Sequence, residues 1–383
     1  MTQNFQMTRP LHVIVATPSG TTGQGGIDRI MGTLKQALID SDEKTMNVRF
    51  LESRGSGNVW LSPFQMLRFC GTMFALKKRG ELDVVHINLS QKGSTYRKMV
   101  IACAAHLLGV PYVLHLHGAE YQTFWKASGP GSMAIRALFE GAANVVVLGT
   151  VWRDFILSRT RDIGDRVTIV PNASAPPTLP HIGGGEGVHI LFLGRLGDRK
   201  GVPQLCEALG RMQGNPAWRA TIAGDGNVDA VRNAISQMEL ADRVDIPGWV
   251  GPQRVAELLS SADILVLPSF AENLPVSVIE GMGSGLAIVT TPVGAVRDII
   301  ADEHSGLLVS PGDVEALTKA LVRLVDDPDL RRRLGEAARA THRDRLHPAI
   351  FADSICKVWR HVAARQRSTS ALEVGRITEA ESK

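Results

Sequence analysis

Hydrophobic residues in this chain form short continuous runs instead of alternating with polar ones. In the first half the runs are rich in valine and isoleucine, and helical patterns separate them. Continuous apolarity indicates strands buried on both faces, which is typical of a parallel sheet covered by helices. The expected strands are residues 12–17, 48–53, 83–89, 111–118 and 144–149.

The same pattern restarts after a break. Residues 171–187 contain Pro-Pro and Gly-Gly-Gly, which is the composition of a linker. A second series of strands is expected over residues 189–194, 220–224, 244–248, 262–269, 287–291 and 306–309. The pattern predicts two doubly wound α/β domains, 1–172 and 188–345, joined by a linker over 173–187. Ligands of such folds bind in the cleft at the carboxyl ends of the strands.

Composition supports a folded protein of two domains. The chain has 383 residues, of which 44% are hydrophobic and 21% are charged, and one hydrophobic core rarely serves that length. Its four cysteines are scattered with no Cys-x-x-Cys, so neither a disulfide scaffold nor a zinc site is expected. No signal peptide and no apolar run of membrane-spanning length is present, and we expect a cytoplasmic protein.

Charge is divided unevenly along the chain. Residues 1–172 hold 19 Lys and Arg against 12 Asp and Glu, whereas residues 173–345 hold 17 against 22. No nucleic-acid motif accompanies the basic half, so an anionic membrane surface is the expected partner and nucleic acid is not. The candidate contacts lie at a helical segment, residues 63–79, which would otherwise simply pack on a sheet: Arg68, Lys77, Lys78 and Arg79.

Two cations follow the first strand of the second domain. Arg195 and Lys200 lie between Gly194 and Gly201, and glycine allows a ligand to approach the backbone closely. Single surface cations usually have no such role. A guanidinium and an ammonium at a strand-to-helix turn nevertheless suit a diphosphate, because helix amides point at the same place.

Two carboxylates eight positions apart, Glu272 and Glu280, surround the start of a later helix. Asn273 near the cap and Pro275 in the first turn indicate where that helix begins. The carboxylates can accept hydrogen bonds from sugar and ribose hydroxyls. The alternative is that Glu272 is a loop charge and Glu280 an exposed helical one.

These stretches, with Gly25-Gly26 and His117-Gly118 in the first half, resemble the retaining glycosyltransferases of family 4 from bacterial cell-envelope pathways. The signature of that family is an arginine and a lysine followed by E-x7-E. The resemblance implies the GT-B fold, in which a last helix, here 346–366, crosses back to the N-terminal domain. We expect the polar residues 367–383 to form a disordered tail.

The resemblance also implies roles for individual residues. Arg195 and Lys200 would grip the donor diphosphate, Glu272 the transferred sugar and Glu280 the ribose. The remaining expected donor contacts are Gly25, Gly26, Asn273 and Leu274, with His117 near the reacting centre. His117 ends an expected strand, although a lone histidine is more often structural.

An acceptor site is expected at loops of the N-terminal domain. Lys92 and Ser94 follow one expected strand and Glu120 follows His117, although a plain connecting loop at 90–94 is nearly as plausible. The chain has no Asp-x-Asp, and one His-x-His is weak evidence for a metal. We therefore expect no metal and no cofactor besides the donor substrate.

The function expected from these residues is transfer of a sugar, with retention, from a nucleoside diphosphate to an acceptor hydroxyl. The basic N-terminal half favours a lipid-linked acceptor in polysaccharide or cell-envelope synthesis. Two alternatives stay open: a sugar-nucleotide epimerase of the same fold, and a nucleotide-binding partner protein without catalysis. The sequence does not identify the base, the sugar or the oligomeric state.

Overall fold

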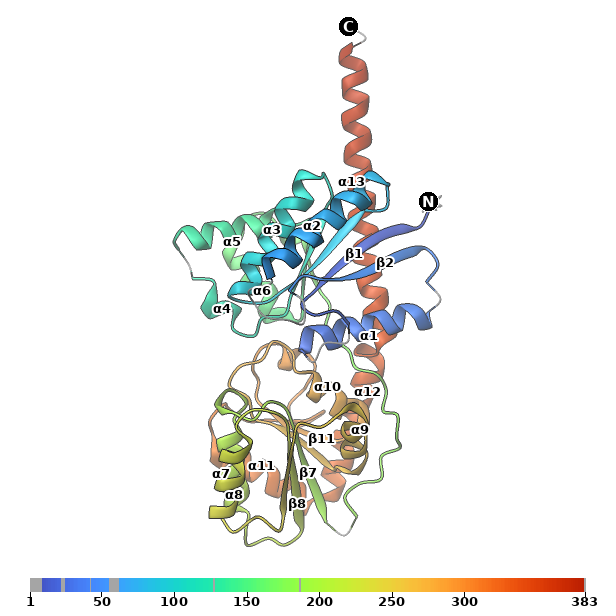
Figure 1. Cartoon of the computed structure of the whole chain (residues 1–383). Coiled ribbons are helices and arrows are strands. Elements are labelled where there is room, and N and C mark those ends of the chain that lie inside the picture. Colours follow the sequence, from blue (N-terminus) through green and yellow to red (C-terminus); the bar gives the residue numbers. More distant parts are fainter. Residues whose placement is uncertain are drawn as a thin grey trace. The chain divides into compact units, whose positions relative to one another are not determined.

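The computed structural model describes residues 9–21, 25–41, 43–54, 62–126, 128–185 and 187–381, with the backbone alone at 62 and 369–381. The chain divides into two compact units. The N-terminal unit combines Met1–Pro171 with Pro348–Lys383, and the C-terminal unit is Asn172–His347. In Figure 1 the N-terminal unit is blue to green with the long red helix, and the C-terminal unit runs from green to orange.

The N-terminal unit contains a sheet of six parallel strands in the order β2-β1-β3-β4-β5-β6. Strands β3, β4 and β5 are buried along their whole length, which explains their continuous apolar sequences. The strands are β1 (Leu11–Thr17), β2 (Met46–Glu52), β3 (Val84–Leu89), β4 (Tyr112–Leu116), β5 (Asn144–Val147) and β6 (Val167–Ile169).

Helices cover both faces of this sheet. From β1 the chain moves outward to β2 and then back past β1 to β3, so right-handed crossovers place α1 on one face and α2 and α3 on the other. The last helix, α13, packs against α1 and contacts β1 and β3. The helices are α1 (Gly26–Asp40), α2 (Ser62–Lys78), α3 (Gly93–Leu107), α4 (Tyr121–Phe124), α5 (Pro130–Glu140), α6 (Thr150–Arg159) and α13 (Pro348–Glu381).

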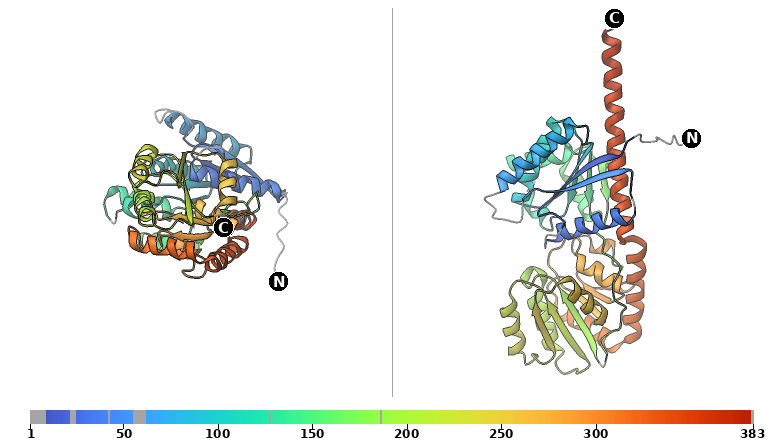
Figure 2. Two further views of the ribbon diagram at one scale, coloured as in Figure 1. Left: turned by 90° about the horizontal axis from the view of Figure 1, so that it is seen from below. Right: turned by 45° about the vertical axis from the view of Figure 1, so that its right-hand side comes forward.

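Helix α13 is the expected crossing helix, since it follows the C-terminal unit in sequence and belongs to the N-terminal one. Phe351, Ile355 and Trp359 are buried at helical spacing. The helix differs from the expectation at its end, because it continues to Glu381 through residues expected to form a disordered tail (Figure 2). Polar composition misled the prediction: alanine, leucine and glutamate in this segment are strong helix formers.

The C-terminal unit repeats the architecture with a six-stranded sheet in the order β12-β11-β10-β7-β8-β9. Its strands are β7 (Val188–Leu193), β8 (Trp218–Ala223), β9 (Val244–Gly248), β10 (Ile264–Leu267), β11 (Ala287–Thr290) and β12 (Leu307–Leu308). Its helices are α7 (Val202–Arg211), α8 (Val228–Gln237), α9 (Pro252–Ser261), α10 (Val276–Ser284), α11 (Val314–Asp326) and α12 (Pro328–Arg345). The expected fold class of two parallel α/β sheets is confirmed.

The described residues of the expected linker have irregular backbone, and hydrogen bonds attach them to the C-terminal unit. The amide of Ile182 donates to the carbonyl of Ser260 at 2.8 Å, and the amide of Gly184 donates to Asp263 at 3.0 Å. Asn172, where the C-terminal unit begins, donates from Nδ2 to the carbonyl of Leu274 at 3.0 Å. Composition therefore predicted the absence of helix and strand, but not these contacts.

Candidate functional site

The turn after β7 brings Arg195 and Lys200 to the carboxyl edge of the C-terminal sheet. It passes through a short 3-10 helix, Asp198–Lys200, and reaches α7 through Gly201, whose φ is 69°. A Cβ atom at position 201 would lie 2.0 Å from the carbonyl oxygen of Pro268. Glycine is therefore required here by its left-handed backbone and by the close approach of the β10 loop.

Lys200 and Glu272 form an ion pair between two loops. Lys200 Nζ lies 2.5 Å from Glu272 Oε1, and the two side chains are 15% and 9% exposed. The hydroxyl of Ser269 donates to the same oxygen at 2.8 Å. The structure thus joins two residues that are 72 positions apart, because the strands before them, β7 and β10, are neighbours in the sheet.

Arg195 has a different environment. Its side chain is 70% exposed and lies 3.6 Å from Asp225, so the guanidinium remains accessible to a ligand. Arg199 instead has a structural contact, since its guanidinium donates to the carbonyl of Ala271 at 2.9 Å. Of the three cations in this turn, Arg195 and Arg199 are exposed, Arg199 is bonded to a backbone carbonyl, and Lys200 is bonded to a buried carboxylate.

The loop that carries Glu272 is tightly packed. The amide of Ala295 donates to the carbonyl of Asn273 at 2.7 Å, and a Cβ at Gly294 would lie 2.3 Å from the carbonyl oxygen of Glu272. Asn273 and Leu274, both expected to contact the donor, are buried. Their contact with the donor stays a prediction.

Glu280 is half-buried on α10, eight positions after Glu272. Helix α10 begins at Val276, so Pro275 is its N-cap residue and does not lie in the first turn, as the sequence predicted it would. The two glycines that follow Glu280 in α10, Gly281 and Gly283, allow close packing. A Cβ at Gly281 would lie 2.9 Å from Leu265, and one at Gly283 would lie 3.0 Å from His342.

Gly25 and Gly26 lie at the start of α1 in the N-terminal unit. Gly25 is the N-cap residue with an extended backbone, φ −74°, and a Cβ at Gly26 would meet nothing within 4 Å. Neither steric space nor backbone angle demands glycine here, so the surface stays open beside the helix amides. Gly23, the start of the expected glycine loop, lies outside the described residues. Asp28 is buried and accepts from the amide of Ser19 at 3.1 Å, which is a structural role.

His117 lies at the carboxyl end of β4, as predicted, and is oriented by Asn88 of β3. Asn88 Nδ2 donates to the carbonyl of Ala16 at 3.1 Å, so its Oδ1 must be the atom 2.9 Å from His117 Nε2. His117 therefore donates through Nε2, and in the neutral ring Nδ1 is left as an acceptor. Burial, followed by the nearby His86, lowers the pKa of His117.

A buried chain of hydrogen bonds lies behind His117. Trp359 Nε1 donates to His86 Nδ1 at 3.1 Å, so His86 must donate through Nε2 to His115 Nδ1 at 3.2 Å. His115 then carries its proton on Nε2, an atom that is buried with no hydrogen-bond partner. The rings of His115 and His117 stack with centroids 4.0 Å apart. His115 therefore lies deeper in the sheet than His117.

Sequence reasoning missed His86 and Asn88. Both lie within β3, a strand buried along its length, and they face the two histidines of β4 through the parallel register. The sequence did contain a signal for this cluster. Each of the two adjacent strands carries two polar residues two positions apart, and residues at that spacing lie on the same face of a sheet.

Two family models cover most of the chain. The model described as "Glycosyl transferase 4-like domain" matches residues 11–173, and the model "Glycosyl transferases group 1" matches residues 185–341. The chain is a glycosyltransferase of the family-4 type.

The chain is similar to glycosyltransferases whose names differ. Alpha-maltose-1-phosphate synthase of Mycolicibacterium smegmatis is 29% identical over 68% of this chain and 76% of its own length. UDP-Gal:alpha-D-GlcNAc-diphosphoundecaprenol alpha-1,3-galactosyltransferase of Escherichia coli is 24% identical over 66% of this chain and 70% of its own. Anabaena HepE in complex with UDP and glucose superposes with a TM-score of 0.72 and 17% identity, covering 92% of this chain and 100% of that chain. The structural likeness shows the GT-B fold.

The expected acceptor residues of the glycosyltransferase lie on two neighbouring loops. Lys92 is exposed with φ 59°, and Ser94 Oγ accepts from the amide of Ser90 at 3.3 Å. A Cβ at Gly118 would lie 2.4 Å from Gln91 Oε1, so the loop after β3 touches the loop after β4. Glu120, half-buried, is the N-cap residue of α4 in that second loop.

Two features are absent from the described residues. No group of three or more His, Cys, Asp or Glu side chains among them is arranged to hold a metal ion. None of the helices within the described ranges combines the length and the apolar character that crossing a bilayer requires.

Proposed function

We propose that this glycosyltransferase moves a hexose, with retention, from a nucleoside-diphosphate sugar to a hydroxyl of a lipid-linked acceptor in bacterial polysaccharide or cell-envelope synthesis. The observation that carries the proposal is the pair of Lys200 and Glu272 on one sheet edge with the exposed Arg195. A sugar nucleotide needs positive charge for its diphosphate and hydrogen-bond acceptors for its sugar hydroxyls. The two cations and the carboxylate at this sheet edge supply both.

The cations act on the leaving group. Negative charge collects on the diphosphate as its oxygen separates from the anomeric carbon, and fixed positive groups stabilise that charge without reorganising. Lys200 also holds Glu272 in one orientation through the 2.5 Å contact. Glu272 then accepts a hydrogen bond from the transferred sugar, and Glu280 accepts from the ribose.

Retention is supported by the environment of Glu272. Its Oε1 already accepts from Lys200 and Ser269, which makes it a poor nucleophile for the double displacement of glycoside hydrolases. In front-side attack the acceptor oxygen bonds to the anomeric carbon, its proton passes to the departing phosphate oxygen, and the carbon–oxygen bond to phosphate breaks. The alpha product named for the E. coli relative is what retention yields from an α-linked donor.

Product analysis tests the proposal. The purified protein should be incubated with UDP-, GDP- and ADP-sugars and a polyprenyl diphosphate-linked sugar, and the anomeric coupling constant of the product measured by NMR. We expect one donor to react and its anomeric configuration to be preserved. An inverted product would refute retention, and an isomerised sugar formed without acceptor would identify an epimerase instead. Donor binding without turnover would identify a non-catalytic nucleotide-binding protein.

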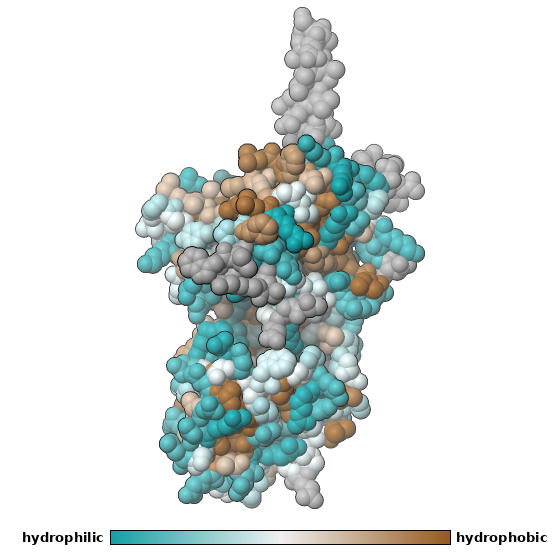
Figure 3. Space-filling view, viewed as in Figure 1, coloured by the Kyte–Doolittle hydropathy of each residue, from teal (hydrophilic) through white to brown (hydrophobic). Residues whose placement is uncertain are grey.

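We further propose that the protein is peripheral on the inner face of the plasma membrane, through α2 and α3. These helices pack together and contain no aspartate or glutamate. Phe64 and Leu67 of α2 are 68% and 73% exposed, and Tyr96 of α3 is 55% exposed. Figure 3 shows apolar side chains gathered over this region. Exposed apolar groups among cations suit an anionic bilayer surface.

Vesicle co-sedimentation tests this surface. We expect binding to anionic but not neutral vesicles, with weaker binding at high salt because screening acts over about 10 Å at 0.1 M. Vesicle binding should be abolished by charge reversal at Arg68, Lys77, Lys78 and Arg79. A matched control reverses four exposed cations of the C-terminal unit, which should leave binding unchanged: Lys319, Arg323, Arg332 and Arg343. Equal loss in both variants, or equal recovery on neutral vesicles, would refute the surface.

A further inference from the structure

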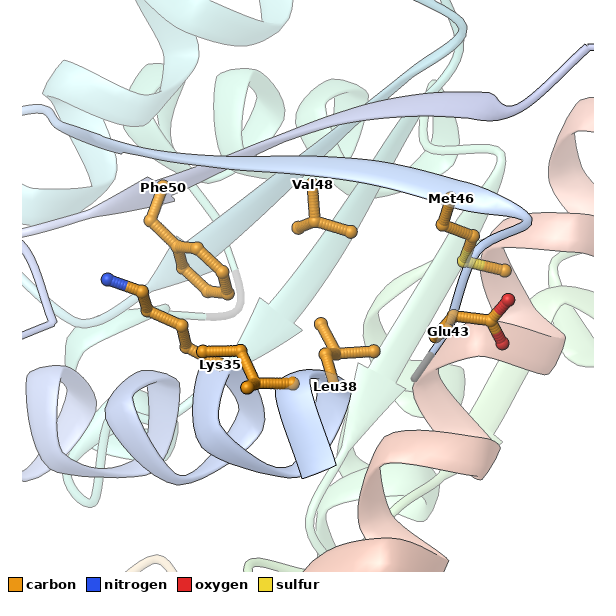
Figure 4. Close-up of a pocket in the computed structure, with 7 residues that line it drawn as sticks. Lys35, Leu38, Glu43, Met46, Val48 and Phe50 are labelled. Carbon is orange, nitrogen blue, oxygen red and sulfur yellow. The ribbon is translucent and has the colours of Figure 1, made fainter. Parts of the chain in front are cut away.

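Strand β2 is an edge of the N-terminal sheet, and an apolar groove runs along it. Within the described residues β2 pairs only with β1. The groove, about 400 Å³, lies between β2 and α1 (Figure 4). Its lining residues are Lys35, Leu38, Ile39, Glu43, Met46, Val48 and Phe50.

The backbone of β2 has hydrogen-bonding groups directed away from β1. The amide of Leu11 donates to the carbonyl of Thr45, and the amide of Ser53 donates to the carbonyl of Thr17, both at 2.8 Å. The odd-numbered residues of β2 therefore face β1, because backbone groups alternate between the two sides of a strand. The even-numbered residues Met46, Val48 and Phe50 direct their N–H and C=O groups outward.

This edge lacks the usual protection against pairing. Natural edge strands are commonly interrupted by proline or a bulge, or carry charges. All seven residues of β2 pair with β1 in unbroken register, and none is proline. Of the two charged residues of β2, Arg49 is ion-paired with Glu81 at 2.8 Å, and Glu52 lies at the very end of the strand. Beside the strand, Ile39 of α1 is 61% exposed.

We propose that this edge joins two copies of the chain, with β2 of one copy antiparallel to β2 of the other about a two-fold axis at Val48. The outward groups of Val48 then bond to Val48 of the second copy, and Met46 lies opposite Phe50 of the second copy. These are hydrogen-bonded pairs, as the outward direction of the even residues requires. The interface is isologous, and it buries the groove of each copy against the other.

Charge along the groove fits the same two-fold arrangement. Figure 4 shows Lys35 beside Phe50 at one end of the groove and Glu43 beside Met46 at the other. The antiparallel pairing brings Lys35 of each copy to Glu43 of the other. Arg360, which donates to Glu43 at 2.6 Å, holds that carboxylate at its end. A parallel pairing of the same two edges would instead put the two grooves on opposite faces of the joined sheet, where their charges could not meet.

The first test removes one outward amide. In Val48→Pro the missing N–H is one that β1 does not use, and proline is tolerated on an edge strand with that orientation. Light scattering coupled to size exclusion should find a dimer for the wild type and a monomer for Val48→Pro, and unchanged donor hydrolysis should show that the variant is folded. Asn47→Pro is the contrasting variant: it removes an amide that faces β1, so it should unfold. A monomeric wild type, or a dimeric Val48→Pro, would overturn the proposal.

The second test uses charge exchange and does not depend on how proline is tolerated. Lys35→Glu alone and Glu43→Lys alone each place like charges at both ends of the interface, so each should be monomeric. An equimolar mixture restores opposite charges at both ends and should form heterodimers. Failure of the mixture to associate, with both variants folded, would overturn the proposed orientation.

Discussion

Replacing Lys200 with methionine should affect folding and turnover for two separable reasons. Methionine keeps most of the side-chain volume and removes the ammonium. Glu272 then stays as a carboxylate that is 9% exposed and bonded to the Ser269 hydroxyl alone. An unpaired buried charge of this kind costs about 3 kcal/mol of unfolding free energy. Loss of a cation at the leaving group should lower turnover by about a hundredfold or more.

A second substitution separates the two effects. In Lys200→Met with Glu272→Gln no charge is left unpaired, and the amide oxygen still accepts from Ser269. Stability should therefore return to near the wild-type value, whereas turnover should stay low because the ammonium is still missing. Urea unfolding followed by tryptophan fluorescence measures the first quantity, and donor hydrolysis measures the second.

Lys319→Met is the matched control. Lys319 and Glu315 are also 2.5 Å apart, but their side chains are 74% and 69% exposed, so water solvates the glutamate that is left. We expect no measurable change in stability or turnover. The reasoning is refuted if Lys200→Met is as stable as this control. It is also refuted if the double variant regains turnover, since the rate loss would then come from misfolding.

Three further predictions concern the rest of the molecule. Trp359→Phe leaves the buried Nδ1 of His86 without its donor and should lower the free energy of unfolding by about 2 kcal/mol, measured in urea. Burial lowers the pKa of His86 from 6.5 to about 3. Below pH 6.5 the unfolded chain therefore binds a proton at this histidine that the folded chain does not, and His86 alone should lower stability by about 2 kcal/mol at pH 5. Burial lowers the pKa of His115 and His117 in the same direction, so the total loss should be larger. A urea midpoint that is equal at pH 7 and pH 5 would contradict this. Donor hydrolysis should persist in excess EDTA, because Arg195, Lys200 and helix amides meet the diphosphate charge; loss of activity with rescue by manganese would refute the metal-free site.

The strands were predictable because burial on both faces of a strand requires a continuous run of apolar residues in the sequence. The exception is β6, whose three residues are half-buried and too few to form a pattern. The pairing of Lys200 with Glu272 could not be read from the chain, because it depends on β7 and β10 being adjacent in the sheet. Sequence separates these strands by β8 and β9, and strand order is a property of the folded sheet.

The place of a site residue could be predicted where it follows from the residue's position in a strand or loop. His117 was found because it ends a buried strand. The tautomer of His117 could not be predicted, because it is deduced from the hydrogen bond between Asn88 and the backbone of β1. Asn273 and Leu274 were assigned to the donor from the resemblance, and the structure shows the packing that buries them.

The hydrogen bond between Trp359 and His86 joins residues 273 positions apart, which has a consequence for how the protein is made. A ribosome adding about 5–20 residues per second needs roughly 15–55 s to pass from one to the other. Throughout that time β3 lacks its contacts with α13, because that helix has not yet been synthesised. The C-terminal unit, a single continuous segment, is complete before this helix emerges. The first unit to begin synthesis is therefore the last to finish folding.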